Sequence, residues 1–224
     1  MPLSSRLHAM AQSESVLPAL HRRAARLEWL TTLWNVVEAV VAVGSGAVAG
    51  STALVAFGVD STIEVSSSVA VLWRLLKVGA DASKEDHERA DRRAHFFVGV
   101  TFFLLATYVC IEGGLSLLRK EPSHTSEVGI LLACASLVAM PALAFAKQRT
   151  GRDMGSQALV ADARENWMCA YLSLSLFLGL GLNAWLGWWW ADPLAGLVMV
   201  PFMVWQGWSA IREATESEGR QEDR

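Results

Sequence analysis

The sequence predicts an all-α integral membrane protein, a bundle of six transmembrane helices with both termini in the cytoplasm. The composition, the lengths of the apolar stretches and the placement of the basic residues all predict this fold class. Of the 224 residues, 53% are hydrophobic and 18% are charged, and the mean hydropathy is +0.32. A soluble domain is typically about 45–50% apolar and about 25% charged, so this composition favours a lipid environment.

Six apolar stretches are long enough to cross a bilayer. A hydrocarbon core about 30 Å thick requires roughly 20 apolar residues in a helix, because lipid offers no partners for unpaired backbone groups. The stretches that meet this requirement are 27–47, 52–76, 95–118, 126–147, 157–186 and 190–213. The expected organisation is a cytoplasmic N-terminal segment at 1–26, a six-helix transmembrane domain at 27–213 and a short polar tail at 214–224.

The basic residues predict the orientation. Of the 19 Lys and Arg residues, 17 lie in the N-terminal segment, the second and fourth connections and the tail, and the other side has only Arg119 and Lys120. Cytoplasmic loops carry the excess of basic residues, so both termini are expected in the cytoplasm. The second connection, which mixes both signs of charge, is expected to be a solvated loop.

The first three predicted helices carry ionisable groups at membrane depth, where each costs at least ~2.5 kcal/mol. In the first, Asn35 and Glu38 lie on one stripe with Glu28, and they either line an inner approach to a site or bond to neighbouring helices. In the second, Asp60 and Glu64 are four residues apart and therefore share one face. In the third, the spacing predicts that Glu112 accepts a bond from Tyr108 or from another helix.

The fifth predicted helix carries a second pair of possible ligands, and the sixth begins with residues that favour a helix start. The first turns of the fifth helix, through Asp162, are expected in the cytoplasm or in a water-filled cavity. Glu165 and Cys169 follow at a spacing of four residues. The sixth helix is expected to start with Asp192 as its N-cap and Pro193 at its first position. The interiors of the six predicted spans contain no Lys or Arg, which argues against pairing of the buried acids with basic residues.

Two helices with such pairs are expected to meet at a four-ligand pocket. A divalent cation neutralises carboxylates that otherwise repel each other, and oxygen and sulfur donors suit zinc-like ions. An isolated buried cysteine is also commonly a small apolar residue. The candidate metal ligands are Asp60, Glu64, Glu165 and Cys169. The candidates for a pathway or secondary role are Asn35, Glu38, Glu112 and Asp162.

At these positions the chain resembles the cation diffusion facilitators, six-helix transporters of zinc and related metals. The second helix of that family carries HxxxD or DxxxD, and the fifth reads approximately S-x-A-L-x-A-D-A-x-H-x-x-x-D. The corresponding segments here are STALVAFGVDSTIE at 51–64 and SQALVADARENWMC at 156–169, and the resemblance covers about 25–216. It carries the family's ligands over to Asp60, Glu64, Glu165 and Cys169. The family's usual cytoplasmic C-terminal domain is expected to be absent.

The resemblance implies efflux of a divalent transition metal by metal/proton antiport, and a homodimer in the membrane. Ligands must lose protons to hold metal, so proton coupling also follows from the chemistry. Zinc is the first expectation, with cadmium and mercury favoured by a thiolate and iron, cobalt and manganese tolerated by carboxylates. No prosthetic group is expected. We expect a bacterial inner membrane as the location.

The sequence also argues against some functions and leaves two alternatives to metal efflux open. A net charge of −3 argues against a nucleic-acid partner. An enzyme is not expected, because the spans contain no Ser/His or paired-His motif. One alternative is a proton-coupled exporter of organic cations that uses the same acids. The other is a non-transporting membrane subunit that senses metal or modulates another transporter.

Overall fold

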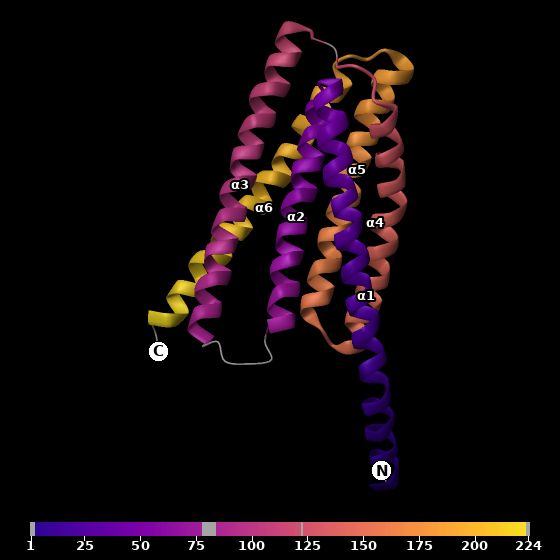
Figure 1. Ribbon diagram of the computed structural model, residues 1–224, viewed down its shortest axis with the longest axis vertical. Coiled ribbons are helices and arrows are strands. Elements are labelled where there is room, and N and C mark those ends of the chain that lie inside the picture. Colours follow the sequence, from indigo (N-terminus) through magenta and orange to yellow (C-terminus); the bar gives the residue numbers. More distant parts are fainter. Residues whose placement is uncertain (1–2, 78–83, 122, 223–224) are drawn as a thin grey trace.

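The computed structural model describes residues 3–77, 84–121 and 123–222, and within these ranges the regular structure is entirely helical (Figure 1). This confirms the all-α prediction. The helices are α1 (Leu3–Ala49), α2 (Thr52–Lys77), α3 (Lys84–Arg119), α4 (Glu127–Met154), α5 (Gln157–Leu186) and α6 (Ala191–Glu222).

The fold is a helical bundle, and most of its helices are long and apolar enough to span a membrane. Five helical segments in the described part of the chain are long and apolar enough to cross a bilayer, namely Ala19–Ala49, Phe96–Arg119, Glu127–Met154, Leu159–Leu186 and Ala191–Arg212. The helix α2 is not among them, and it is the helix that carries Asp60 and Glu64. Both termini lie toward the same end of the bundle (Figure 1). The assignment of that end to the cytoplasm stays a prediction.

Three helices extend beyond the predicted spans. The helix α1 already begins at Leu3, and α6 continues through the polar tail to Glu222; residues 223–224 of that tail lie outside the described ranges. The prediction of a solvated loop before the third span is wrong from Lys84 onward, because α3 begins there; residues 78–83 are also outside the described ranges. These extensions are rich in Glu, Arg, Lys, Gln and Ala, which have a high intrinsic helix propensity.

A tight turn joins α4 to α5. Gly155 closes α4 in the left-handed conformation at a φ of 66°, and Ser156 then caps α5 by accepting the backbone N–H of Leu159 at 3.3 Å. A left-handed residue after a helix strongly favours glycine, and a serine hydroxyl satisfies an otherwise unpaired N–H at a helix start. The chain reverses within two residues. The end of α4 therefore lies against the start of α5.

At the opposite end, α6 is tied to the turn between α1 and α2. The carboxylate of Asp192 accepts the hydroxyl of Ser51 at 2.6 Å, and both side chains are buried. The expected N-cap role of Asp192 is wrong by two positions: α6 begins at Ala191, so Trp190 is the N-cap and Asp192 lies in the first turn. Helix ends are uncertain by one or two residues from sequence alone.

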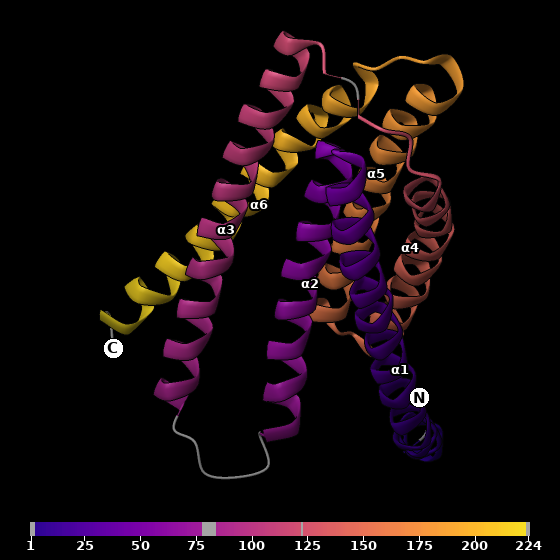
Figure 2. The ribbon, with the colours of Figure 1, turned by 45° about the horizontal axis from the view of Figure 1, so that its top comes forward.

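The helices pack as two groups. The helix α3 packs mainly on α6, whereas α1 packs on α2 and α4, and α4 packs on α5. Figure 2 shows α3 and α6 crossing as a pair beside the other four helices. The backbones of the pair nearly touch, since a Cβ added at Gly99 would lie 2.9 Å from the carbonyl oxygen of Gly207. Small residues permit such close approach.

Candidate metal centre

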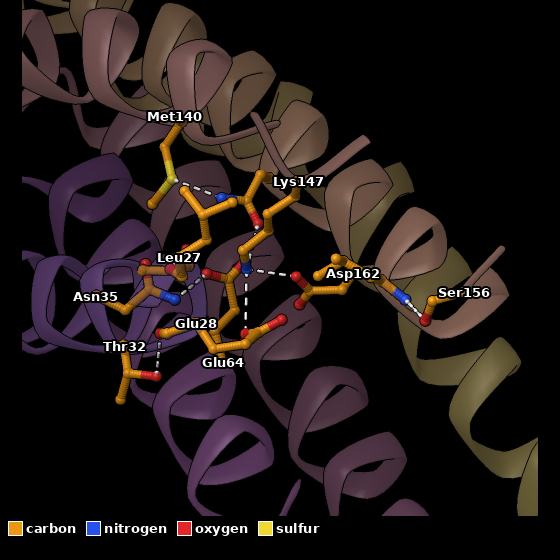
Figure 3. A network of polar contacts seen from close by, with 12 residues as sticks. Leu27, Glu28, Thr32, Asn35, Glu64, Met140, Lys147, Ser156 and Asp162 are labelled. Carbon is orange, nitrogen blue, oxygen red and sulfur yellow. Dashed lines mark hydrogen bonds and ion pairs between the residues drawn. The ribbon is translucent and has the colours of Figure 1, made fainter. Parts of the chain in front are cut away.

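The face of α2 that carries Asp60 and Glu64, here called the α2 pair, turns into the bundle. The side chain of Asp60 is 1% exposed, and Glu64 is half-buried. The amide nitrogen of Asn35 on α1 donates to Glu64 Oε2 at 2.7 Å (Figure 3). Among the described residues, two buried side-chain oxygens accept no hydrogen bond, Asp60 Oδ2 and Asn35 Oδ1. The interior beside the α2 pair is therefore rich in acceptors and poor in donors.

Glu38 is fully buried one helical turn along α1 from Asn35. Its carboxylate accepts hydrogen bonds from Trp34 Nε1 at 2.7 Å, Ser136 Oγ at 2.5 Å and Ser61 Oγ at 3.2 Å, and the thiol of Cys169 approaches it at 3.9 Å. These donors come from α1, α4, α2 and α5. Of the two roles that the sequence left open for Glu38, these contacts show bonding to neighbouring helices.

The helix α5 supplies the second predicted pair. Cys169 is buried against Glu38, whereas Glu165 is largely exposed. The carboxylate of Glu165 is nevertheless close enough for its charge to repel charges on Asp60 and Glu64. The four predicted ligands thus share one region between α2 and α5. However, no three His, Cys, Asp or Glu side chains within the described ranges lie close enough together to hold a metal ion in this conformation.

A buried lysine lies at the end of the bundle that holds the α4–α5 turn. The Nζ atom of Lys147, whose side chain is 0% exposed, donates to Glu28 Oε2 at 3.2 Å, to Asp162 Oδ2 and to Asn166 Oδ1 at 3.4 Å (Figure 3). We call these four residues the Lys147 network. It joins α4 to α1 and α5, with Glu28 and Asp162 partly accessible to solvent. A buried charge requires such partners, because an unpaired one is costly to desolvate.

Lys147 was not among the predicted site residues, because its position at the end of a span predicted a cytoplasmic basic residue. The prediction that the spans bury no basic side chain is therefore wrong for α4. A signal was present: Lys147 continues the stripe Ser136, Met140, Ala144 at helical spacing, and all four side chains are buried. Lys147 contacts Glu28, Asp162 and Asn166, and no contact with Asp60 or Glu64 is observed in the described part of the chain.

Two of the candidates for a secondary role, Asp162 and Glu112, lie in different parts of the molecule. Asp162 belongs to the Lys147 network, next to the α2 pair, because its charge also acts on Glu64. Glu112 lies instead on the exposed face of α3, near Tyr108. The predicted hydrogen bond of Glu112 to Tyr108 or to another helix stays a prediction.

Membrane-length helices that bury carboxylates define a polytopic membrane protein, and buried acids at this depth are typical of ion or proton pathways. Residues 29–217 match the family model of the cation efflux transmembrane domain. The chain belongs to the cation efflux family, and it is an integral multi-pass membrane protein. This places it among transporter domains rather than enzymes, as predicted.

Several bacterial proteins are similar to the chain. An uncharacterized transporter of Synechocystis is 27% identical over 177 residues, which cover 78% of this chain and 57% of the relative. The manganese efflux system protein MneS of Bacillus subtilis is 25% identical over 75% of this chain and 58% of its own length. The cation-efflux pump FieF of Klebsiella pneumoniae is 24% identical over 75% and 57%. The matches thus span little more than half the length of these relatives.

Proposed function

We propose that the chain exports a divalent transition-metal cation through its helical bundle in exchange for protons. The observation that carries this proposal is the burial of Asp60, which is 1% exposed and keeps one carboxylate oxygen without a hydrogen bond. Such a group is costly at membrane depth unless a cation or a proton accompanies it. The family match supports a cation as the cargo.

The proposed ligands are those predicted from the sequence, Asp60, Glu64, Glu165 and Cys169. In the present conformation no three of these four side chains lie close enough together to bind one ion. We therefore expect a bound ion to draw α5 toward the α2 pair. Rocking of helices within the bundle would then expose the site to each side in turn, as in other transporters.

Protons are the proposed counter-ions, because metal binding requires ligands that have lost theirs. Zinc remains the first metal to test, and manganese is the second, because one similar protein is named as a manganese efflux system. Cadmium, mercury, iron and cobalt follow. The bacterial plasma membrane belongs to this proposal, in line with the bacterial origin of the relatives. A homodimer is proposed as well, on the resemblance to the cation diffusion facilitators.

The test is metal flux into proteoliposomes that contain a pH-sensitive dye. Wild type is compared with a double variant, Asp60→Ala with Glu165→Ala, for each of the six metals. The matched control is Asp153→Ala, which removes an exposed carboxylate from the last turn of α4. We expect flux of at least one metal with opposing proton movement in wild type and in the control, and loss of flux in the double variant.

Two results would contradict the proposal. If the double variant retained wild-type flux, the acids would not form the transport site. If the folded wild type bound metal but moved none of the six ions, the chain would instead be a metal-sensing or modulatory subunit. Flux of organic cations without metal flux would favour the exporter of organic cations.

A further inference from the structure

We infer that Asn35 of α1 contributes its amide oxygen as a metal ligand beside Asp60 and Glu64, so that the site extends over a third helix and is dominated by oxygen donors. This inference rests on the proposed function and adds a residue that neither the sequence analysis nor the family pattern assigned to the ligands. It is supported by the buried oxygen atoms that lack a hydrogen bond.

The amide group of Asn35 is oriented by Glu64. Its nitrogen donates to Glu64 Oε2 at 2.7 Å, and an ionised carboxylate can only accept. This contact identifies the nitrogen end of the amide and leaves Oδ1 as an acceptor. The residue is 1% exposed, so its oxygen does not reach bulk solvent.

The two acceptors that lack donors both belong to this part of the bundle. They are Asn35 Oδ1 and Asp60 Oδ2, the only such atoms found within the described ranges. Asn35 contacts Glu64, and Glu64 lies one turn from Asp60 on the same face of α2. Because buried oxygens are normally satisfied, two unsatisfied oxygens beside one carboxylate indicate a place for a cation.

Glu38 provides the contrast. It is equally buried, but its carboxylate already accepts from donors on several helices, including the Cys169 thiol at 3.9 Å. Glu38 therefore needs no ion, and in this conformation the thiol of Cys169 is directed to Glu38. A site built from two carboxylates and an amide oxygen favours manganese, iron or cobalt over the thiophilic ions cadmium and mercury.

The test compares two substitutions of Asn35 in the full chain in detergent. Asn35→Leu removes the oxygen and the nitrogen donor, whereas Asn35→Asp keeps an oxygen at this position and removes the donor to Glu64. The matched control is Asn183→Leu, which removes another buried amide, one that donates to the backbone of Ser123 at 3.1 Å. Binding of Mn²⁺ is measured from the EPR signal of the free ion, and binding of Cd²⁺ by calorimetry.

We expect Asn35→Leu to weaken Mn²⁺ binding at least about tenfold, and to weaken Cd²⁺ binding less. Asn35→Asp should bind Mn²⁺ at least as tightly as wild type, because the ligand oxygen remains and gains charge. If Asn35 only positioned Glu64, the Asp variant would instead bind as weakly as the Leu variant or more weakly, since it loses the donor and adds repulsion.

The outcomes separate this inference from the proposed function. Wild-type Mn²⁺ affinity in a folded Asn35→Leu variant would overturn the inference and leave transport by the other ligands intact. Failure of wild type to bind any of the metals would overturn both. If Asn35→Leu is not recovered as a folded protein, the Asn35→Asp variant decides: retained Mn²⁺ binding supports the ligand role, and lost binding contradicts it.

Discussion

At the scale of single residues, Glu38 and Lys147 show how a bundle interior tolerates charge. Glu38 is surrounded by hydroxyl, indole and thiol donors, and Lys147 is surrounded by carboxylate and amide oxygens. In both cases the partners come from several helices. Each charge is therefore stabilised only in the assembled bundle, and each specifies which helices must meet.

Replacement of Glu38 by Ala should destabilise the fold. The change removes the acceptor of the half-buried Trp34 indole and of the buried Ser136 hydroxyl, and a buried donor without an acceptor costs about 1–3 kcal/mol. We expect a loss of about 3 kcal/mol in the free energy of unfolding, measured by denaturation in detergent. The matched control is Glu127→Ala at an exposed position of α4, which should change it by under about 1 kcal/mol. Equal stability of the two variants would show that the contacts of Glu38 contribute nothing net.

Replacement of Lys147 by Met should also destabilise the fold, because it leaves Glu28 and Asp162 beside each other without a cation. Breaking a fully buried pair costs about 3–5 kcal/mol. Because both acids are partly exposed, we expect about 2 kcal/mol in the same unfolding measurement. Arg149→Met, an exposed position on the same helix, is the control.

A double variant provides the sharper check on the Lys147 network. Addition of Asp162→Asn to Lys147→Met removes one of the two repelling charges, so it should restore part of the lost stability. Strictly additive losses from the two substitutions would mean that the two side chains do not interact energetically, despite their contact in the structure.

At the scale of the element, sequence patterns were most informative inside the helices and least informative at their ends. Apolar length predicted the positions of the five membrane-length helices, but it could not predict that α1 begins at Leu3 or that α3 begins at Lys84, because the sequence of these extensions has no long apolar stretch. The spacing of four residues predicted that Asp60 and Glu64 share one helix face and that Glu165 and Cys169 share another. Their role as metal ligands stays a prediction.

The contact between α3 and α6 provides a prediction at this scale. A methyl group at Gly99 would lie 2.6 Å from Ile211 Cγ1 and 2.9 Å from the carbonyl oxygen of Gly207, so Gly99→Ala must push the helices apart. We expect a loss of about 1–3 kcal/mol in the free energy of unfolding.

The same substitution at a second glycine of α3 is the control. A methyl group at Gly114 would meet nothing within 4 Å, so Gly114→Ala should be neutral or should stabilise the helix by up to about 1 kcal/mol. Equal stability of the two alanine variants would contradict the close packing of α3 on α6.

At the scale of the whole molecule, the choice of partners for each helix was beyond the sequence. The α3–α6 pair depends on small residues that meet only after folding, such as Gly99 and Gly207. In the same way, the hydrogen bond of Asn35 to Glu64 and the burial of Lys147 depend on which faces of α1, α4 and α5 turn inward. A single sequence gives the periodicity of a helix but not the identity of its neighbours.

The Lys147 network also has a kinetic consequence. It joins α1, α4 and α5 at one end of the bundle, so separation of these helices there must first break its contacts. Their free energy then adds to the activation barrier for opening, and each 1.36 kcal/mol changes a rate about tenfold. We therefore expect the same lysine that stabilises the resting bundle to set how long that end stays closed in the proposed transport cycle.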